Sequence, residues 1–446
     1  MKKEEKYTLE RKAEQKYLWL RFGNGLNELF IHNRLKLIIL AIYLTTIAVL
    51  WLNKYKAIDI LAYINPDDNF IIIISQLINI LLPSLSIIGL FYLIVWVGTP
   101  YGAMQIHENL WRVGFVNHAG ETPILIRKYK QKSKKKHSII VMEFQSNGLP
   151  LPEWEKQQAK IETALNVNHV KVTQGSDKQK NLLYTVSGNI NLPEIIYWKK
   201  EYLSDKSFEL VLGESLLGIE TVNLAKIPHI LLGGSTGSGK SVLLKLLIMQ
   251  CIKKNAKVYI ADFKGGVDFA SWQNRCQIIT NEKRLLEILT DIVDELDNRK
   301  KIFYSTACAD INHYNELAGI PIERIIFACD EVAEMLDKTG LSKEAKEIIT
   351  QIEGKLSVIA RQGRAFGIHL ILATQRPDAN ILTGQIRNNI DFRVCGRADN
   401  VLSQIILDNT GAADKIPKDA QGRFLTHEGT VFQGYLFDEN KAFERG

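Results

Sequence analysis

A glycine-rich segment that ends in a lysine and a serine carries the clearest chemistry in this sequence. It follows the short apolar run 230–232, precedes the apolar stretch VLLKLLIMQC, and consists of Gly234, Ser235, Thr236, Gly237, Ser238, Gly239, Lys240 and Ser241. This order of strand, loop and helix is typical of a P-loop, in which glycines let backbone N–H groups turn toward phosphates and the helix N-terminus adds a positive dipole. We expect Lys240 to neutralise the β- and γ-phosphates of ATP and Ser241 to hold Mg²⁺.

Two acidic residues stand at the end of another apolar run. The run 324–329 (RIIFAC) leads directly into Asp330 and Glu331. A carboxylate at the carboxyl end of a buried strand can reach a metal, and the next residue can address an attacking water. We therefore expect Asp330 to hold Mg²⁺ through water and Glu331 to act as the general base. Such a pair can also be no more than a helix cap, but the glycine-rich segment favours the catalytic interpretation.

Further polar residues complete the predicted catalytic set. Gln375 follows the apolar run 368–374, where it can sense whether a γ-phosphate is present. A helix predicted over 341–364 has Arg361 and Arg364 at its end. In ring-shaped motors an arginine at such a place reaches the triphosphate of the neighbouring subunit, which requires an oligomer. The residues leave open which of the two arginines acts in this way, and a solvated helix end is the alternative.

The elements around these residues predict one fold class. Helical patterns separate five short apolar runs, at 230–232, 258–262, 324–330, 368–374 and 392–395. This spacing is typical of an α/β domain with a mostly parallel sheet. The composition agrees, because 46% hydrophobic and 24% charged residues in a chain of 446 are ordinary for a folded protein. The net charge of +7 fits nucleic acid, lipid headgroups or simple solubility, and five cysteines without a Cys-x-x-Cys pair indicate a reduced, cytosolic setting.

Several ordered motifs resemble the FtsK/SpoIIIE family of DNA translocases. The string GIHLILATQRP at 367–377 is similar to the hallmark of that family, and the helix with DELDNR at 294–299 is similar to its equivalent helix. Further matches are the sequence IPHI at 227–230, Thr383 with Gly384, and the residues 388–391. The resemblance predicts a motor domain over 214–446 and covers the preceding segment more weakly.

The resemblance implies a RecA-like fold, a hexameric ring, ATP hydrolysis and DNA in a central channel. It also places Arg364 where the family has its trans-acting arginine, and Arg376 and Arg387 in the stretch that lines the channel. Contacts of this kind to phosphates are independent of base sequence and sensitive to salt. For Arg387 a solvated helix face is the alternative. A basic channel would serve single- and double-stranded DNA equally.

Two long apolar runs near the N-terminus predict a two-helix transmembrane hairpin. The run 35–52 has one charged residue, near its edge, and the run 70–97 has none. A helix needs roughly 20 residues to cross a bilayer core. Basic residues concentrate before the first run and after the second, so the positive-inside rule predicts a multi-pass plasma-membrane protein with both termini in the cytoplasm. We expect a cytoplasmic leader over 1–34, and two membrane helices with a short external loop within 35–98.

The segment 99–213 predicts a small α+β cytoplasmic domain between the membrane helices and the motor. Short alternating strands such as 137–143 and 182–186 surround one helical stretch over 154–165. The loop predicted over 127–136 (RKYKQKSKKK) is the densest basic run of the chain. It could bind anionic lipid or nucleic acid, or it could be a solvated hairpin tip.

The most specific functional hypothesis rests on the size of the chain. Chromosome-segregating members of the family have about four membrane spans, a long linker and a winged-helix reader after the motor, whereas this sequence predicts two spans and stops at Gly446. It resembles more the coupling proteins of conjugative plasmids and integrative elements in Gram-positive bacteria, which pass DNA with its relaxase to a transfer channel. The expected partners are therefore DNA, relaxase, channel proteins, membrane lipid and further copies of the chain in a homo-hexamer.

Other functions fit part of the same pattern. A DNA pump in chromosome or plasmid partition would have the same motor and the same cargo as a coupling protein. Only genetic neighbourhood or a mating assay separates this role from conjugation. A secretion ATPase would move protein, although such ATPases usually join several motor domains. A membrane scaffold with a regulatory nucleotide switch would need neither Glu331 nor Arg364. The sequence singles out no surface for docking a relaxase.

Overall fold

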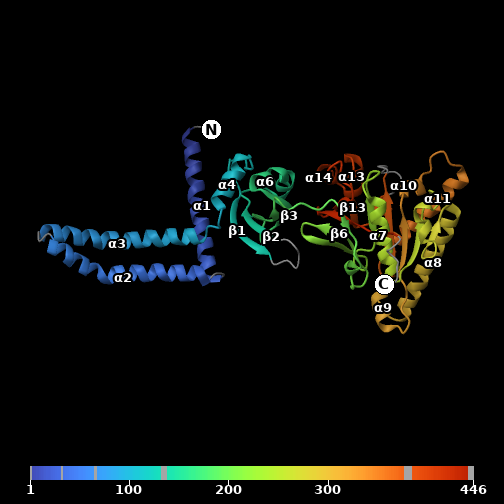
Figure 1. Cartoon of the computed structure of the whole chain (residues 1–446), viewed down its shortest axis with the longest axis horizontal. Coiled ribbons are helices and arrows are strands. Elements are labelled where there is room, and N and C mark those ends of the chain that lie inside the picture. Colours follow the sequence, from blue (N-terminus) through green and yellow to red (C-terminus); the bar gives the residue numbers. More distant parts are fainter. Residues whose placement is uncertain (1–2, 32–33, 65–67, 132–137, 376–383, 440–446) are drawn as a thin grey trace. The chain divides into compact units, whose positions relative to one another are not determined.

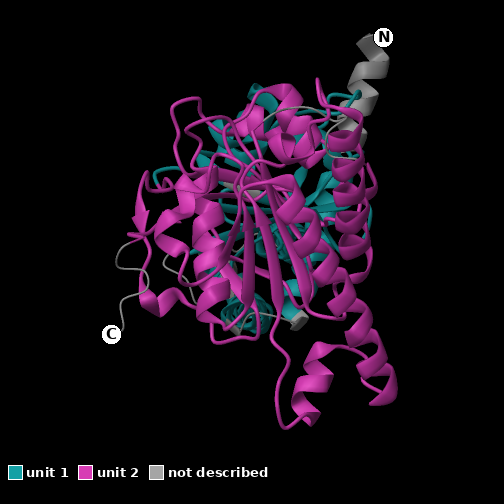
Figure 2. Cartoon of the chain, turned by 90° about the vertical axis from the view of Figure 1, so that its right-hand side faces the viewer, with its two compact units in different colours: residues 1–134, 138–189 teal, residues 135–137, 190–446 magenta. Residues whose placement is uncertain are grey.

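A computed structural model describes residues 3–31, 34–64, 68–131, 138–375 and 384–439. The chain forms two compact units, one of residues 1–134 and 138–189 and the other of residues 135–137 and 190–446 (Figure 2). Within the described ranges, the first unit contains three long N-terminal helices and a small antiparallel sheet, and the second contains a large sheet covered by helices (Figure 1).

The long helices of the first unit are α1 (Lys3–Ile31), α2 (Arg34–Ile64) and α3 (Asp68–Val97). In α2 the stretch Leu35–Ile60 and in α3 the stretch Asn69–Val97 have mean hydropathies of 2.3 and 2.4. By length and composition both stretches suffice to cross a membrane.

Two interhelical hydrogen bonds show how α2 and α3 are paired. The Tyr43 hydroxyl donates to the backbone oxygen of Ser86 at 2.7 Å, and Nζ of Lys54 donates to the side chain of Asn79 at 3.0 Å. Moving forward along α2 from Tyr43 to Lys54 means moving backward along α3. The two helices therefore run antiparallel, as the short connection between them requires.

The small sheet of the first unit is antiparallel, in the order β1-β2-β4-β3. Its strands are β1 (Ile124–Gln131), β2 (Ile139–Gln145), β3 (Val167–Gln174) and β4 (Lys180–Ser187), and its helices are α4 (Ala103–Arg112), α5 (Leu151–Lys156) and α6 (Gln158–Leu165). One face of the sheet packs on these helices. In the core between them the ring of Trp154 meets Phe115 and Phe144, at centroid distances of 5.0 and 5.2 Å.

Two predictions about this segment were wrong. The basic run 127–136, predicted as a loop, supplies residues 127–131 to strand β1, and residues 132–136 lie outside the described part of the chain. Lysines are tolerated there because β1 is an edge strand with one side open to water. The helix predicted over 154–165 is divided into α5 and α6 at Gln157, whose φ of −102° and ψ of 19° are not helical.

The large sheet has a parallel and an antiparallel half. Eleven strands of the described residues take part, ten of them in the order β10-β9-β11-β12-β8-β13-β14-β15-β6-β7, with β5 beside β15. The neighbours from β10 to β13 are parallel and comprise β8 (Ile230–Gly233), β9 (Lys257–Ala261), β10 (Gln277–Ile279), β11 (Ile325–Cys329), β12 (Ile368–Thr374) and β13 (Phe392–Cys395). From β13 onward the neighbours are antiparallel and comprise β14 (Arg423–Thr426), β15 (Val431–Leu436), β6 (Glu209–Ser215) and β7 (Gly218–Asn223).

The antiparallel half changes two expectations. The sheet is mixed rather than mostly parallel, because two hairpins extend it beyond β13. The unit that contains the glycine-rich segment also begins at residue 190, ahead of the expected residue 214. The reason is that β5 (Ile196–Tyr197) and β6 both pair with β15, which ties the segment before the P-loop to the end of the chain.

Helices cover both faces of the large sheet (Figure 2). One hydrophobic core joins the sheet to α8 and α11, and another joins it to α7. The helices of this unit are α7 (Lys240–Lys253), α8 (Glu282–Ser305), α9 (Ile311–Leu317), α10 (Val332–Leu336), α11 (Lys343–Gln362), α12 (Gly384–Arg387), α13 (Asn400–Leu407) and α14 (Gly411–Lys415), with short 3₁₀ helices at Lys200–Tyr202 and Val267–Trp272.

Two buried histidines fasten the start of β8 to β12 and α11. Nδ1 of His229 accepts from the backbone N–H of Leu370 at 3.0 Å, so Nε2 carries the proton and donates to the carbonyl of Ala360 at 3.0 Å. Nδ1 of His369 faces the carbonyl of Pro228 at 2.9 Å and donates to it. Burial lowers the pKa of His229 to about 4, so this ring is neutral at pH 7.

We expect mild acid to destabilise the second unit through His229. Its pKa is about 4 in the folded chain against 6.5 for an ordinary histidine, so between these pH values the unfolded chain binds more protons. The stability contributed by the neutral ring is complete above pH 6.5 and falls as the pH is lowered toward 4, with a loss of about 2 kcal/mol at pH 5. Thermal unfolding of the detergent-solubilised chain at pH 7 and pH 5, followed by tryptophan fluorescence, measures this loss.

The variant His229→Gln should unfold with a weaker dependence on pH, because glutamine does not titrate. His313→Gln is the matched control, since His313 is exposed in the same unit. If all three proteins showed the same change between pH 7 and pH 5, the assignment to His229 would be wrong.

Candidate nucleotide-binding site

The carboxyl ends of four parallel strands meet at one edge of the large sheet. Cys329 of β11 is paired with Ala261 of β9 and with Leu372 of β12, and Thr374 of β12 is paired with Gly233 of β8. Residues that directly follow these strands therefore share this edge, where α/β sheets bind their ligands. They are Asp262, Asp330, Gln375 and Gly234.

The glycine-rich segment follows a path that only glycine allows at two positions. A Cβ on Gly234 would lie 2.4 Å from Oγ of Ser238. Gly239 has a φ of 95°, and a Cβ there would lie 2.9 Å from Cα of Gly422. Helix α7 begins at the next residue, Lys240, and none of the described side chains caps its N-terminus. The first N–H groups of α7 are therefore available to an anion.

Lys240, Ser241 and Asp330 form a closely packed polar cluster. Nζ of Lys240 donates to Oδ1 of Asp330 at 2.8 Å and to its backbone oxygen at 2.6 Å, and Oγ of Ser241 donates to the same Oδ1 at 2.9 Å. The Lys240 and Asp330 side chains are only 2% and 4% exposed. Burial raises the pKa of Asp330, but Lys240 and Ser241 outweigh this effect and hold that pKa below its usual range. The carboxyl is therefore ionised.

The oxygen atoms around this cluster fit Mg²⁺. Oδ2 of Asp330 and Oδ2 of Asp262 are buried and accept no hydrogen bond from the described residues. Carboxylate oxygens and the hydroxyl of Ser241 are the hard ligands that Mg²⁺ prefers. No group of three or more His, Cys, Asp or Glu gathers at one point of the described chain. Phosphate oxygens and water would therefore supply the remaining ligands, as is usual for Mg²⁺.

Glu331 accepts hydrogen bonds from two sides. Oγ1 of Thr374 donates to its Oε1 at 2.7 Å, and the backbone N–H of Gln375 donates to its Oε2 at 2.9 Å. Its side chain also accepts from the backbone N–H of Ala333 and so caps α10. The helix-cap and the catalytic interpretations of the sequence are therefore compatible, because one carboxylate can have both roles.

A chain of hydrogen bonds joins the glycine-rich segment to the ends of β12 and β13. Oγ1 of Thr236 donates to Oε1 of Gln375 at 2.9 Å. Nη2 of Arg397 donates to the backbone oxygen of Thr236 at 2.6 Å, and the backbone oxygen of Arg397 accepts from Ser235 N at 2.7 Å. Gln375 thus contacts both the P-loop and Glu331.

Three contributors to this site were not predicted. Nζ of Lys264 lies 3.5 Å from Oδ2 of Asp330, Thr374 orients Glu331, and Arg397 holds the glycine-rich segment. Thr374 and Lys264 could have been found, since each stands at or just after a predicted strand on the same sheet edge. Arg397 also stands just after a predicted strand, at 392–395, but its contact with Thr236 depends on packing that the sequence does not display.

The predicted arginines differ in their surroundings. Arg364 is exposed, and its side chain makes no hydrogen bond or ion pair within the described ranges. Arg361 is also exposed, but its Nε donates to the backbone oxygen of Ser357 at 3.2 Å. Arg387 is half-buried at the end of α12, and its Nε meets no acceptor among the described residues. Arg376 lies outside the described residues.

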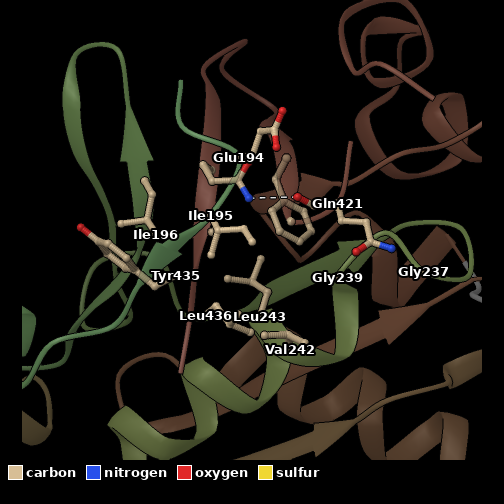
Figure 3. A pocket seen from close by; sticks show the side chains of 14 residues that line it. Glu194, Ile195, Ile196, Gly237, Gly239, Val242, Leu243, Gln421, Tyr435 and Leu436 are labelled. Carbon is tan, nitrogen blue, oxygen red and sulfur yellow. Dashed lines mark hydrogen bonds between the residues drawn. The ribbon is translucent and has the colours of Figure 1, made fainter. Parts of the chain in front are cut away.

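A largely apolar cavity of about 320 Å³ adjoins the glycine-rich segment (Figure 3). Its walls include Ile195, Ile196, Val242, Leu243, Tyr435 and Leu436, with Gly237 and Gly239 at one side. Most small-molecule sites have such walls, with a few polar groups at the rim. The cavity can hold the base and ribose of a nucleotide whose phosphates lie on the glycine-rich segment.

Comparisons with known proteins agree with this geometry. The model of the FtsK/SpoIIIE family matches residues 194–353, which include the glycine-rich segment, Asp330 and Glu331. A solved structure of the pCW3 conjugation coupling protein TcpA, in its monomer form with ATPγS, is 34% identical. It covers 77% of this chain and 97% of its own, with a TM-score of 0.57. The chain belongs to the FtsK/SpoIIIE family.

Curated relatives in the FtsK/SpoIIIE family are longer than this chain. DNA translocase FtsK of Treponema pallidum is 29% identical over 239 residues, which are 50% of this chain and 29% of the relative. DNA translocase FtsK of Helicobacter pylori strain J99 is 33% identical over 237 residues, which are 50% of this chain and 27% of the relative. The family resemblance read from the sequence is confirmed, and with it a P-loop domain of RecA-like fold.

We expect Thr374→Val to slow ATP hydrolysis without weakening ATP binding. The variant removes the hydroxyl that orients Glu331 and leaves the P-loop intact. Loss of alignment at a general base should lower kcat about tenfold and leave KM almost unchanged. Steady-state phosphate release measures both constants.

Thr374→Ser is the matched control, because it keeps the donor and should keep most of the activity. If Thr374→Val raised KM with kcat unchanged, Thr374 would act on nucleotide binding and the role assigned to it would be wrong.

Proposed function

We propose that this chain is a membrane-anchored, ATP-driven DNA translocase that acts as a coupling protein in conjugation, delivering DNA and its relaxase to a transfer channel. The observation that carries the ATPase is the cluster of Lys240, Ser241 and Asp330 beside Glu331 at one sheet edge. Family membership supports the translocase, since the named relatives are DNA translocases. The likeness to TcpA supports the coupling role.

ATP binding would replace the internal contacts of the site. The phosphates would lie on the free N–H groups at the start of α7, and Lys240 would turn from Asp330 to the β- and γ-phosphates. Asp330 and Ser241 would then hold Mg²⁺, which offsets the charge of the phosphates. The base and ribose would enter the cavity beside Gly237 and Gly239.

Hydrolysis would use Glu331 as the proton acceptor. Its carboxylate takes a proton from water while the water oxygen bonds to the γ-phosphorus, and ADP leaves with the bridging oxygen. Thr374 and the backbone N–H of Gln375 hold the carboxylate in place. When the γ-phosphate departs, the Gln375 side chain would lose one contact and keep the one with Thr236.

A homo-hexameric ring would complete the motor. Arg364 is exposed, and its side chain makes no hydrogen bond or ion pair among the described residues, so it is available to the triphosphate of a neighbouring subunit. Arg376 and Arg387 would line the central channel and contact DNA phosphates, which would make binding independent of base sequence.

The N-terminal helices would anchor the motor in the plasma membrane. Apolar side chains of α2 and α3, such as Leu52 and Ile87, are exposed in the chain, which lipid tails would explain. Basic residues flank the two spans, so both termini and the second unit would be cytoplasmic. A pump for DNA partition or an ATPase that moves protein would share the nucleotide site and differ in cargo.

We expect DNA to stimulate the ATPase activity of the full chain in lipid nanodiscs. Phosphate release should rise at least about fivefold with either single- or double-stranded DNA. Both Lys240→Ala and Glu331→Gln should abolish hydrolysis. Lys240→Ala should in addition lose ATP binding, and Glu331→Gln should retain it. Hydrolysis that ignores both DNA forms but responds to a purified relaxase would favour protein as the cargo. A mating assay with the same variants then tests the conjugative role.

We expect Arg364→Ala to lower kcat at least about a thousandfold without changing nucleotide affinity, because it removes a charge supplied to the neighbouring site. Mixing Arg364→Ala subunits with Glu331→Gln subunits should restore part of the activity. In such rings an intact site of the first variant receives an arginine from the second. Arg361→Ala is the matched control, and if it failed in the same way, Arg361 would be the trans-acting residue.

A further inference from the structure

The small sheet of the first unit carries a row of aromatic and basic side chains across its strands. Tyr129 of β1 is paired with Val141 of β2, Val141 with Tyr184 of β4, and Tyr184 with Lys171 of β3. Residues that lie directly opposite each other in an antiparallel sheet project from the same face. The four side chains therefore form one row on one face.

This row lies on the face opposite the helices of the unit. The residues one position along from the row, such as Met142, Leu183 and Val172, belong to the core that packs on α4, α5 and α6. In the row itself Tyr129 is 46% exposed and Val141 is 1% exposed. Tyr184 is half-buried and Lys171 is exposed. The outer surface of the row is therefore formed by two tyrosines and a lysine.

A positive charge lies near each end of the row. Arg127 is paired with Glu143 in the next row of the same face, and its Nε lies 4.0 Å from that carboxylate. Lys128 and Lys130 alternate with Tyr129 along β1 and therefore project from the opposite face. Arg127 and Lys171, two cations, stand against the one carboxylate of Glu143 among these residues of the face. The face suits an anionic ligand with planar groups.

We propose that this sheet face binds single-stranded nucleic acid, with bases stacked on Tyr129 and Tyr184 and phosphates beside Arg127 and Lys171. Every base has a planar face that can stack on an aromatic ring, so such binding needs no particular sequence. The two tyrosines are separated by two strand spacings, roughly 10 Å, which leaves room for one base on each ring.

Other anionic ligands would use only part of this face. A lipid headgroup would meet the cations and leave both rings without a planar partner. In a duplex the bases are already stacked on one another and shielded by the backbones. A single strand offers unstacked bases together with phosphates, so it matches the rings and the charges at once.

The inference rests on the proposed function for the nature of the nucleic acid, which would be the transferred DNA. It adds a second contact in a compact unit that is separate from the nucleotide-binding unit. Such a contact would hold the strand through all stages of the ATP cycle. It also assigns a role to Arg127 and Tyr129, which belong to the described part, 127–131, of the basic run.

Fluorescence anisotropy of a labelled oligo(dT) on the full chain in neutral-lipid nanodiscs tests the inference. We expect Tyr129→Ala with Lys171→Ala to raise Kd about tenfold for oligo(dT) and to leave the Kd for a duplex of the same length unchanged. Tyr129→Phe keeps the ring and should bind as the wild type does. Tyr101→Ala is the matched control, because Tyr101 is exposed in the same unit outside the sheet.

Photocrosslinking with 5-bromodeoxyuridine supplies a readout that does not depend on a variant. Peptides that carry Tyr129 or Tyr184 should be crosslinked, and their absence together with unchanged affinities would overturn the inference. If, with that result, the wild type still bound DNA and hydrolysed ATP in response to it, only this inference would be wrong and the proposed function would stand. If no DNA form bound or stimulated the wild type, the proposed function would fall with it. If the double variant kept its affinity for oligo(dT) and lost only its binding to vesicles that contain phosphatidylserine, the face would be assigned to lipid instead.

Discussion

The ion pair between Lys240 and Asp330 is the interaction on which the nucleotide site depends. Both side chains are buried, and a buried charge without a partner is strongly destabilising. The pair ties the start of α7 to the end of β11, the two elements that would supply phosphate-binding and metal-binding groups in the proposed function. In the proposed function, ATP with Mg²⁺ would offer each charge a replacement partner, phosphate for the lysine and metal for the carboxylate. The site can therefore exchange one neutralised arrangement for another and never leave either charge alone.

The parts of this site that were predictable share a physical origin. Strands of a buried parallel sheet are short apolar runs, and the residues that follow them must meet at one edge. The P-loop, Asp330, Glu331 and Gln375 all stand at such ends, so chain order alone brought them together before any contact was known. The family resemblance was predictable for the same reason, because its motifs are the loops at this edge.

The remaining features depend on pairings that no local pattern displays. The hairpins of the antiparallel half are short, and their place beside β13 is decided by strands from both ends of the second unit. The end of β1 is so rich in basic residues that its composition favours a loop, yet β1 pairs with β2 as an edge strand, and this pairing satisfies its backbone. The contact of Arg397 with Thr236 joins residues far apart in sequence. Neither the periodicity of apolar residues nor the number of charged residues indicates which distant parts of a chain will come into contact.

The cavity beside the P-loop draws its walls from opposite ends of the second unit. Ile195 and Ile196 come from its beginning and Tyr435 and Leu436 from its end, while Val242 belongs to the helix that follows the P-loop. A nucleotide seated there would act as a clasp across these segments. It would hold the terminal strands against the centre of the sheet, so that the folded unit would be most stable when a nucleotide is bound. The first and last strands would be the first to open in its absence, and nucleotide supply would govern the lifetime of the folded protein as well as its work.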